Sequence, residues 1–275
     1  MLHARIRKFF LQQYLPEADI GDNVLYSPGM PRVLSAIVAL MLCAPAFAIT
    51  GHAPPAAGFA ARSIVMLVDG RGDLCTGTAI ARDLVLTAAH CVTRAIDYQV
   101  RVYQTGQSIA VRGIAKHPQF NFENYSASRA TADLALIKLA VPLPGSIVPA
   151  TLAGPRRVGV GETLTIAGFG VTADGTANGL GISRMAALAV TGKPGSLQIR
   201  LFDPATRNQL QGLGACVGDS GAPAFDGDKV TGVVSWSTAP NDEEGCGGLT
   251  GVTPLLIYRG WIVETARKFN SSIVP

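Results

Sequence analysis

Three side chains of the kinds that carry out acyl transfer occur in order along the chain. His90 lies in LTAAHC, Asp133 in ADLALIKL and Ser220 in the glycine-containing stretch CVGDSGAP. An imidazole can take the proton of a serine hydroxyl while a carboxylate orients the ring, which makes the serine a nucleophile toward a carbonyl carbon. Taken singly, each residue has a structural explanation, as a strand-end histidine, a strand-opening aspartate and a turn serine.

Short apolar segments between turn signals predict the strands that would position these side chains. Several segments alternate with period two, and all are shorter than ordinary helices. No long helical pattern separates them, which disfavours a parallel βαβ sheet and favours antiparallel sheets or barrels. The segments are SIVMLV (63–68), DLVLTAA (83–89), YQVRVY (98–103), LALIKL (134–139), TLTIAGFG (163–170), LQIRL (197–201) and KVTGVVSW (229–236).

One helix is predicted near the end of the chain. Trp261, Thr265 and Phe269 are spaced by four residues, with Ile262 and Ala266 beside them, which indicates a helix with one packed face. His52 and His117 lie outside these patterns, and we expect both to be exposed loop residues.

The composition indicates a globular protein. In the 275 residues, 48% are hydrophobic and only 15% are charged, which excludes a disordered chain and a coiled coil. The net charge of +4 is not concentrated in any run, so nucleic acid is not the expected partner.

The segment from Met30 has the form of a secretory signal. Arg32 is followed by a short apolar stretch and by the triplet Ala46-Phe47-Ala48, which is typical of a cleavage site. We therefore expect a leader over 1–48, with the signal at 30–48 and 1–29 not translated, and a secreted protein in the periplasm or outside the cell. A lipoprotein anchor at Cys43 is disfavoured by the large Leu42 before it.

The cysteines favour disulfides over a metal site. Without Cys43, Cys75, Cys91, Cys216 and Cys246 remain of the 5 cysteines, an even number in an exported chain, for which three pairings exist. A metal site that combines these thiols with His90 lacks any CxxC pair, so we expect neither a metal nor another cofactor.

Together, the three motifs identify a resemblance to the trypsin/chymotrypsin family of serine proteases. It runs from Ile49 to about Phe269 and implies an all-β fold of two antiparallel six-stranded barrels with a C-terminal α-helix. The barrels would cover 49–150 and 151–257, and 258–275 would hold the helix and tail.

The resemblance also implies roles for the motif residues. His90 would be the general base and then the general acid, Asp133 would fix its tautomer, and Ser220 would be the nucleophile. The backbone N–H groups of Gly218 and Ser220 would form the oxyanion hole. Ser235 would donate a hydrogen bond to Asp133. By the same resemblance, the implied disulfides are Cys75–Cys91 and Cys216–Cys246.

An ion pair is implied between the new chain end and the nucleophile loop. In this family, a liberated Ile ammonium pairs with the Asp before the nucleophile, which here would join Ile49 to Asp219. The sequence ITG differs from the usual IVGG. Signal cleavage after Ala48 would itself create this activating end.

Five positions match the substrate-binding region: Gly214, Ser235, Trp236, Ser237 and Gly251. Gly214 occurs where trypsin-like members carry an Asp. Gly214 and Gly251 would leave room in the substrate pocket for a medium or large apolar side chain, and Ser237 would narrow the entrance of that pocket. We therefore expect cleavage after apolar or small P1 residues. The alternative is cleavage after Arg or Lys, in which the acidic residues of TAPNDEEG (238–245) would attract basic substrates.

The expected function is that of a secreted serine endopeptidase, a monomer that acts on proteins or peptides. The alternative from another class is a non-catalytic protease homologue that binds partners. An α/β-hydrolase is excluded, because its nucleophile would precede the Asp and the His in the chain.

Overall fold

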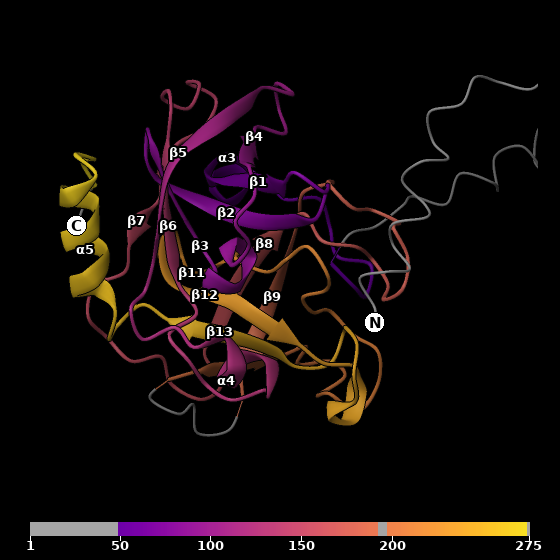
Figure 1. Cartoon of the computed structure of the whole chain (residues 1–275). Helices are drawn as coiled ribbons and strands as arrows, with labels where there is room; N and C mark the ends of the chain where they lie inside the picture. The colour runs from indigo at the N-terminus through magenta and orange to yellow at the C-terminus, as the bar shows by residue number, and fades with distance from the viewer. Residues whose placement is uncertain (1–48, 192–196, 274–275) are drawn as a thin grey trace, which may run out of the picture. The chain divides into compact units, whose positions relative to one another are not determined.

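The computed structural model describes residues 49–191 and 197–273, so the predicted leader over 1–48 lies outside the described residues. All of the described residues belong to one compact unit, residues 47–275. They fold mainly into short strands, with few helices (Figure 1). Among them, no helix has both the length and the apolar character needed to cross a membrane.

The first six strands close into an antiparallel barrel in the order β1-β2-β3-β6-β5-β4. Alternation of side chains explains several of them: in β4, Tyr98 and Val100 are buried while Gln99 and Arg101 are exposed. The strands are β1 (Ile64–Asp69), β2 (Leu74–Ala81), β3 (Leu84–Thr87), β4 (Tyr98–Arg101), β5 (Ser108–Lys116) and β6 (Ala135–Leu139).

The second group of strands closes in the same way. Its sheet has the order β11-β8-β9-β10-β13-β12-β7, and an additional β11–β12 pairing joins six antiparallel strands into a barrel. The short β7 pairs with β12 in parallel outside that ring. The strands are β7 (Thr151–Leu152), β8 (Thr163–Gly168), β9 (Arg184–Val190), β10 (Ile199–Phe202), β11 (Pro223–Asp226), β12 (Lys229–Ser237) and β13 (Thr250–Pro254). The predicted fold class is therefore confirmed.

Each barrel has an apolar interior, and a third cluster of buried residues joins the two barrels. Leu86 and Leu134 from the first barrel pack in this cluster with Phe169 and Phe225 from the second. Ile262 of the last helix belongs to the same cluster. Because burial of such apolar surface stabilises by about 25 cal/mol per Å², this shared core holds the two barrels in a defined arrangement.

The predicted C-terminal helix is α5 (Arg259–Lys268), which packs against β6 (Figure 1). Ile262, Thr265 and Ala266 are buried, and Trp261 and Phe269 pack at the edge of the shared core. The other helical segments are short: α3 (Gly58–Ser63), α4 (Phe122–Ser126) and the 3₁₀ turns η1 (Ala89–Val92) and η2 (Pro240–Asp242).

His117 lies in a loop as expected, but the expectation that it is exposed is wrong. Its side chain is buried, with its ring edge-on to Tyr258 at 4.8 Å and to Trp261 at 4.9 Å between centroids. Burial lowers the pKa of His117, which favours the neutral imidazole in this aromatic pocket. His52, by contrast, is exposed as expected.

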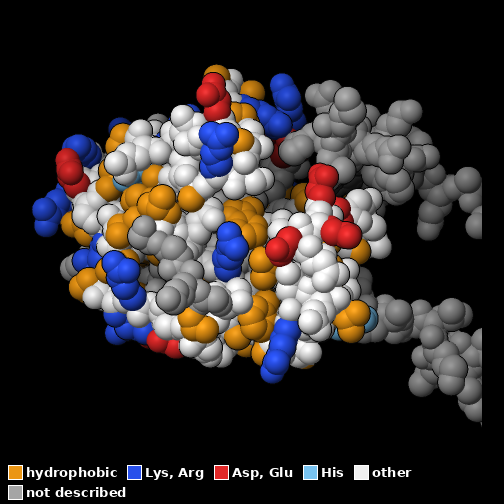
Figure 2. All heavy atoms as spheres, turned by 90° about the horizontal axis from the view of Figure 1, so that it is seen from below, with side chains coloured by type: hydrophobic (Ala, Val, Ile, Leu, Met, Phe, Trp, Pro, Cys, Tyr) orange, Lys and Arg blue, Asp and Glu red, His pale blue; other side chains and the backbone are white. Residues whose placement is uncertain are grey.

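The surface agrees with the modest net charge. On the face seen in Figure 2, Lys and Arg side chains are scattered among uncharged ones, and the described residues of this face form no continuous basic surface.

Candidate active site

His90 lies on η1, immediately after strand β3. The preceding Ala88 is extended and the following residues form a tight 3₁₀ turn, so His90 lies just beyond the end of strand β3. The neighbouring Cys91 forms a disulfide with Cys75 of β2. This bridge fixes the segment that carries His90 to an adjacent strand of the same barrel.

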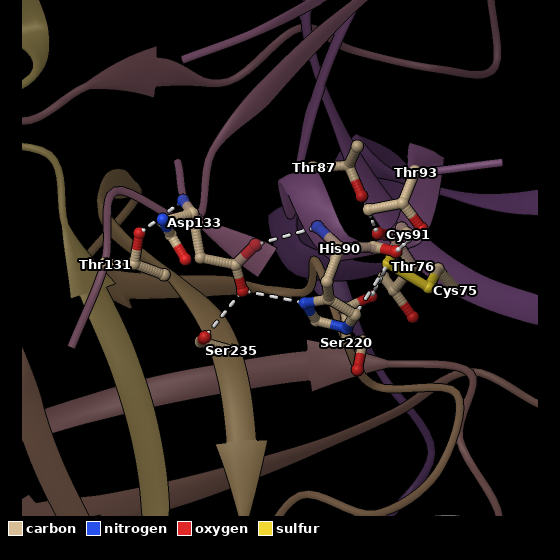
Figure 3. Close-up of polar contacts among 11 residues, drawn as sticks. Cys75, Thr76, Thr87, His90, Cys91, Thr93, Thr131, Asp133, Ser220 and Ser235 are labelled. Atoms are coloured by element: carbon tan, nitrogen blue, oxygen red, sulfur yellow. Dashed lines mark hydrogen bonds and ion pairs between the residues drawn. A yellow bond between two sulfur atoms is a disulfide. The ribbon is translucent and has the colours of Figure 1, made fainter. Parts of the chain in front are cut away.

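Asp133 lies just before β6, and it contacts both the ring and the backbone of His90. Its Oδ2 lies 2.7 Å from His90 Nδ1, and its Oδ1 accepts a hydrogen bond from the His90 N–H at 2.9 Å (Figure 3). Ser235, from strand β12 of the second barrel, donates its hydroxyl to Oδ2 at 2.6 Å. The carboxylate is therefore held between the two barrels.

The Asp133 side chain is only 1% exposed, yet it remains ionised. Burial by itself raises the pKa of Asp133, but the attraction of His90 and the hydrogen bonds from His90 and Ser235 outweigh it and hold that pKa below its usual value. Because an ionised carboxylate can only accept, the proton between the two side chains belongs to His90 Nδ1. Nε2 of His90 is left as the nitrogen that can accept a proton.

Ser220 lies in the turn before β11, with its side chain near the Nε2 side of the His90 ring (Figure 3). The Cys91 sulfur lies 3.7 Å from the Ser220 carbonyl oxygen and 3.8 Å from His90 Nε2, so both groups border the same disulfide. The N–H of Thr76 donates to the Ser220 carbonyl at 2.8 Å. Within the described part of the chain, Ser220 Oγ forms no hydrogen bond.

The turn over 216–221 leaves two N–H groups unused. No described residue accepts a hydrogen bond from the N–H of Gly218 or of Ser220, whereas Asp219 donates to the Cys216 carbonyl at 2.9 Å. Gly218 has φ +99°, and a Cβ there would lie 2.9 Å from Gly170 Cα. The turn therefore requires glycine at this position, both for its conformation and for lack of space.

Comparison with known proteins assigns the family. The sequence model of the family described as Trypsin matches residues 49–262. The chain belongs to the trypsin family. It is a serine endopeptidase that acts on proteins or peptides.

Curated relatives share about a quarter to a third of their residues with this chain. The vitellin-degrading protease of Bombyx mori is 31% identical over 208 residues, which are 69% of this chain and 75% of that protein. The snake venom serine protease rhinocerase 4 of Bitis rhinoceros is 28% identical, over 78% of this chain and 86% of that protein.

Two solved structures share the fold. The structure of HBP has a TM-score of 0.65 at 21% identity and covers 82% of this chain and 99% of its own. Neuropsin, described as a serine protease expressed in the limbic system of mouse brain, has a TM-score of 0.63 at 23% identity. The match covers 78% of this chain and 98% of the neuropsin chain.

Both predicted disulfides of this trypsin-family chain are present, Cys75–Cys91 and Cys216–Cys246. Two clusters have the residue types of a metal site, namely Cys75, His90 and Cys91, and Asp174 with Cys216 and Cys246. In both clusters the sulfurs are oxidised to disulfides, so they cannot act as thiolate ligands.

Asp219, which precedes Ser220, is fully buried and has no cationic partner among the described residues. Its two oxygens accept hydrogen bonds from the N–H groups of Gly170 at 2.8 Å and Cys216 at 2.9 Å. Burial raises the pKa of Asp219 to about 7, against the opposing effect of these two hydrogen bonds. The site thus contains a carboxylate whose charge is poorly compensated.

Ile49 is also fully buried, in the core of the second barrel, with an unusual left-handed φ of 51°. The next residue, Thr50, pairs with Gly214 and donates its hydroxyl to the Gly212 carbonyl at 2.9 Å. In this uncut chain the Ile49 nitrogen belongs to a peptide bond and carries no charge, so the predicted ion pair with Asp219 does not exist here.

The predicted pocket glycines do not leave open space. A Cβ on Gly251 would lie 1.9 Å from a ring atom of Trp236, and one on Gly214 would lie 3.1 Å from the Gly247 Cα. The Trp236 indole therefore fills the space beside Gly251, and Gly214 allows a close backbone contact. Ser237 donates its hydroxyl to the Gly245 carbonyl at 3.1 Å, which ties the strand to the segment before Cys246.

Sequence reasoning missed one residue of the site. The ring of Tyr125, from α4, stacks on the His90 ring with 4.4 Å between centroids and 12° between planes. Asn121 is a recognisable helix cap, so a short helix could have been predicted at this point. Nothing in the sequence pattern indicated which side chain of that helix would contact the histidine.

Proposed function

We propose that His90, Asp133 and Ser220 form a catalytic triad that hydrolyses peptide bonds through an acyl-enzyme on Ser220. His90 Nε2 takes the Ser220 proton as Oγ attacks the carbonyl carbon, and then gives it to the leaving amine. Water attacks the acyl-enzyme by the same proton transfers. The observation that carries this proposal is the pair of hydrogen bonds from His90 to Asp133, which leaves Nε2 as the acceptor on the side of Ser220.

The N–H groups of Gly218 and Ser220 serve as the oxyanion hole. Two donors that make no bond within the described chain are available to the oxygen that becomes negative during attack. Such donors are worth about 10²–10³ in turnover each.

For specificity, we propose cleavage after small or apolar P1 residues. Gly214 supplies no carboxylate for an Arg or Lys side chain, and the indole beside Gly251 favours small side chains over large ones. The competing preference for Arg or Lys relies on Asp242, Glu243 and Glu244, which are all exposed. Chromogenic peptides that end in Ala, Phe and Arg distinguish the two, and fastest cleavage after Arg would refute our proposal.

We further propose that the protein is exported and that the signal over 30–48 is removed after Ala48. The mature chain is then a monomer, with its two barrels over 49–150 and 151–257. The freed Ile49 ammonium would then pair with Asp219. The buried Ile49 side chain and the uncompensated Asp219 carboxylate support this step. N-terminal sequencing of the secreted protein tests it, since a mature end at any residue other than Ile49 contradicts self-activation by signal cleavage.

The catalytic proposal is tested by covalent labelling with a fluorophosphonate, which reacts only with an activated serine. We expect the mature protein to be labelled and Ser220→Ala to remain unlabelled. Ser272→Ala, a change at an exposed serine of the C-terminal tail, is the matched control and should label fully. Absence of labelling in the folded mature protein would favour the non-catalytic binding protein instead.

A further inference from the structure

The two rings of His90 and Tyr125 form a near-parallel pair within the proposed triad. Their centroids lie 4.4 Å apart with 12° between the ring planes, so the two rings are stacked face to face. Nothing in the triad roles set out above requires an aromatic residue here. The pair therefore calls for a separate explanation.

The Tyr125 ring is held in place by its own segment. The Asn121 side chain accepts a hydrogen bond from the Asn124 N–H at 2.7 Å and caps the short helix α4. The Asn121 N–H donates to Thr131 Oγ1 at 2.8 Å, which ties the start of the helix to the loop that leads to Asp133. The Phe120 and Phe122 rings flank Tyr125 at 6.4 and 6.2 Å. Tyr125 is thus fixed relative to Asp133 as well as to His90.

His90 is enclosed on several sides. Its Nδ1 edge meets Asp133, its Nε2 lies 3.8 Å from the Cys91 sulfur, and one face of the ring is covered by Tyr125. As a result, the His90 side chain is only 11% exposed. Without Tyr125, the imidazole could rotate about its side-chain bonds toward solvent, and water would reach the Nδ1–Asp133 hydrogen bond.

The phenol stays neutral in this setting. Burial, and secondarily the negative charge of Asp133, raise the pKa of Tyr125. A neutral aromatic face attracts a cation through its quadrupole, whereas a phenolate would add a second titrating charge to the site.

We propose that Tyr125 is a positioning residue for the triad. Its ring fixes the plane of His90 so that Nδ1 remains on Asp133 and Nε2 on the side of Ser220, and its face stabilises the imidazolium that forms when Ser220 loses its proton. The proposal depends on the proposed triad function. It assigns α4 a role in the chemical step.

The test compares Tyr125→Phe, Tyr125→Leu and Tyr125→Ala in the mature enzyme with a small chromogenic substrate. Tyr125→Phe keeps the aromatic face and should retain kcat within about 2-fold, whereas Tyr125→Ala should lower kcat by about 10-fold or more with little change in KM. Glu123→Ala is the matched control, because Glu123 lies on α4, is exposed and forms no side-chain bond with any described residue. A second readout is the ¹H NMR signal of the His90 Nδ1 proton, which should persist in Tyr125→Phe and broaden by exchange with water in Tyr125→Ala.

Three results would overturn the proposal. The first is an unchanged kcat and proton signal in Tyr125→Ala, and the second is a change in Tyr125→Ala that is confined to KM. The third is full kcat in Tyr125→Leu, a variant that keeps the apolar bulk without a π face and that serves as the test if Tyr125→Ala does not fold. Failure of the triad itself is distinguishable, because the wild-type protein would then not react with the fluorophosphonate.

Discussion

Asp133 contacts His90 at two points: its Oδ2 lies 2.7 Å from Nδ1 of the ring, and its Oδ1 accepts a hydrogen bond from the backbone N–H at 2.9 Å. A single hydrogen bond would leave the carboxyl group free to rotate about its own axis. The second bond removes that freedom and fixes which oxygen faces the ring. The tautomer of His90, and with it the identity of the accepting nitrogen, therefore depends on the charge of Asp133.

Asp133→Asn should preserve the fold and remove most of the activity. An amide in this position can present its NH₂ group to Nδ1, which stabilises the tautomer with the proton on Nε2. That tautomer cannot take the Ser220 proton, and we expect kcat to fall by about 10⁴-fold. Steady-state kinetics at pH 7–8, with circular dichroism as the control for folding, measure this. A loss below 10-fold would mean that Asp133 does not set the tautomer.

Ser235→Ala should have a much smaller effect than Asp133→Asn. It removes the hydroxyl that donates to Asp133 Oδ2 at 2.6 Å but leaves both contacts with His90. A buried charged acceptor that loses one donor costs about 1–3 kcal/mol, so both stability and kcat should fall modestly. Thermal unfolding and kcat measured on one preparation check this. Equal losses in Ser235→Ala and Asp133→Asn would contradict the division of roles.

Gly218→Ala should abolish most of the acylation rate. The residue has φ +99°, and a Cβ would lie 2.9 Å from Gly170 Cα, so the turn that exposes the two N–H groups must shift. We expect at least about a 10²-fold slower reaction with the fluorophosphonate. Gly227→Ala is the control, since Gly227 also has positive φ (+61°) but open space around it. Similar rates in the two variants would show that the shape of the 216–221 turn is not critical.

The uncut chain should lose stability as the pH rises from about 4 to about 7. The pKa of Asp219 is about 7 in the folded chain, against roughly 3.9 when unfolded. Between these values the folded state keeps a proton that the unfolded state releases. The free energy of unfolding therefore falls across this window, by roughly 4 kcal/mol in total, and levels off above it.

This pH dependence is measured by urea unfolding of the refolded uncut chain at several pH values, and the difference from Asp219→Asn isolates the contribution of this one group. Cleavage after Ala48 should remove the decline, because the Ile49 ammonium would then compensate the carboxylate. Identical pH profiles for the uncut chain and its Asp219→Asn variant would contradict the assignment.

Strands with clear alternation or a continuous apolar run were predictable, and others were not. The segments of β1, β3, β4, β6, β8, β10 and β12 were all identified from sequence. β2 (LCTGTAIA), β5 (SIAVRGIAK), β7, β9 (RMAALAV), β11 and β13 were missed. In β2 and β9, the reason is that Ala and Gly have low strand propensity. These strands are stabilised by ladder hydrogen bonds with both neighbours, which no local pattern records.

The same limit explains the errors around the site. Gly251 suggested an open pocket, yet the indole of Trp236 fills it. His117 was expected to be exposed in its loop, yet its ring is buried against Tyr258 and Trp261. In both cases the deciding neighbour comes from another strand or from the terminal helix. A glycine indicates that a side chain is missing, but not what takes its space.

By itself, the sequence determined the chemical groups of this protein: an imidazole, a carboxylate and a hydroxyl in three recognisable motifs, the four cysteines that pair, and enough alternating segments for two barrels. Only the tertiary structure brought His90 to Asp133 across 43 positions and Ser235 to the same carboxylate across 102. It also decided that Tyr125 covers the His90 ring and that Asp219 is buried with no cation from the described part of the chain beside it. The reason is that motifs and periodicity are local properties, whereas contact, burial and the resulting pKa shifts depend on packing between segments that are distant in the chain.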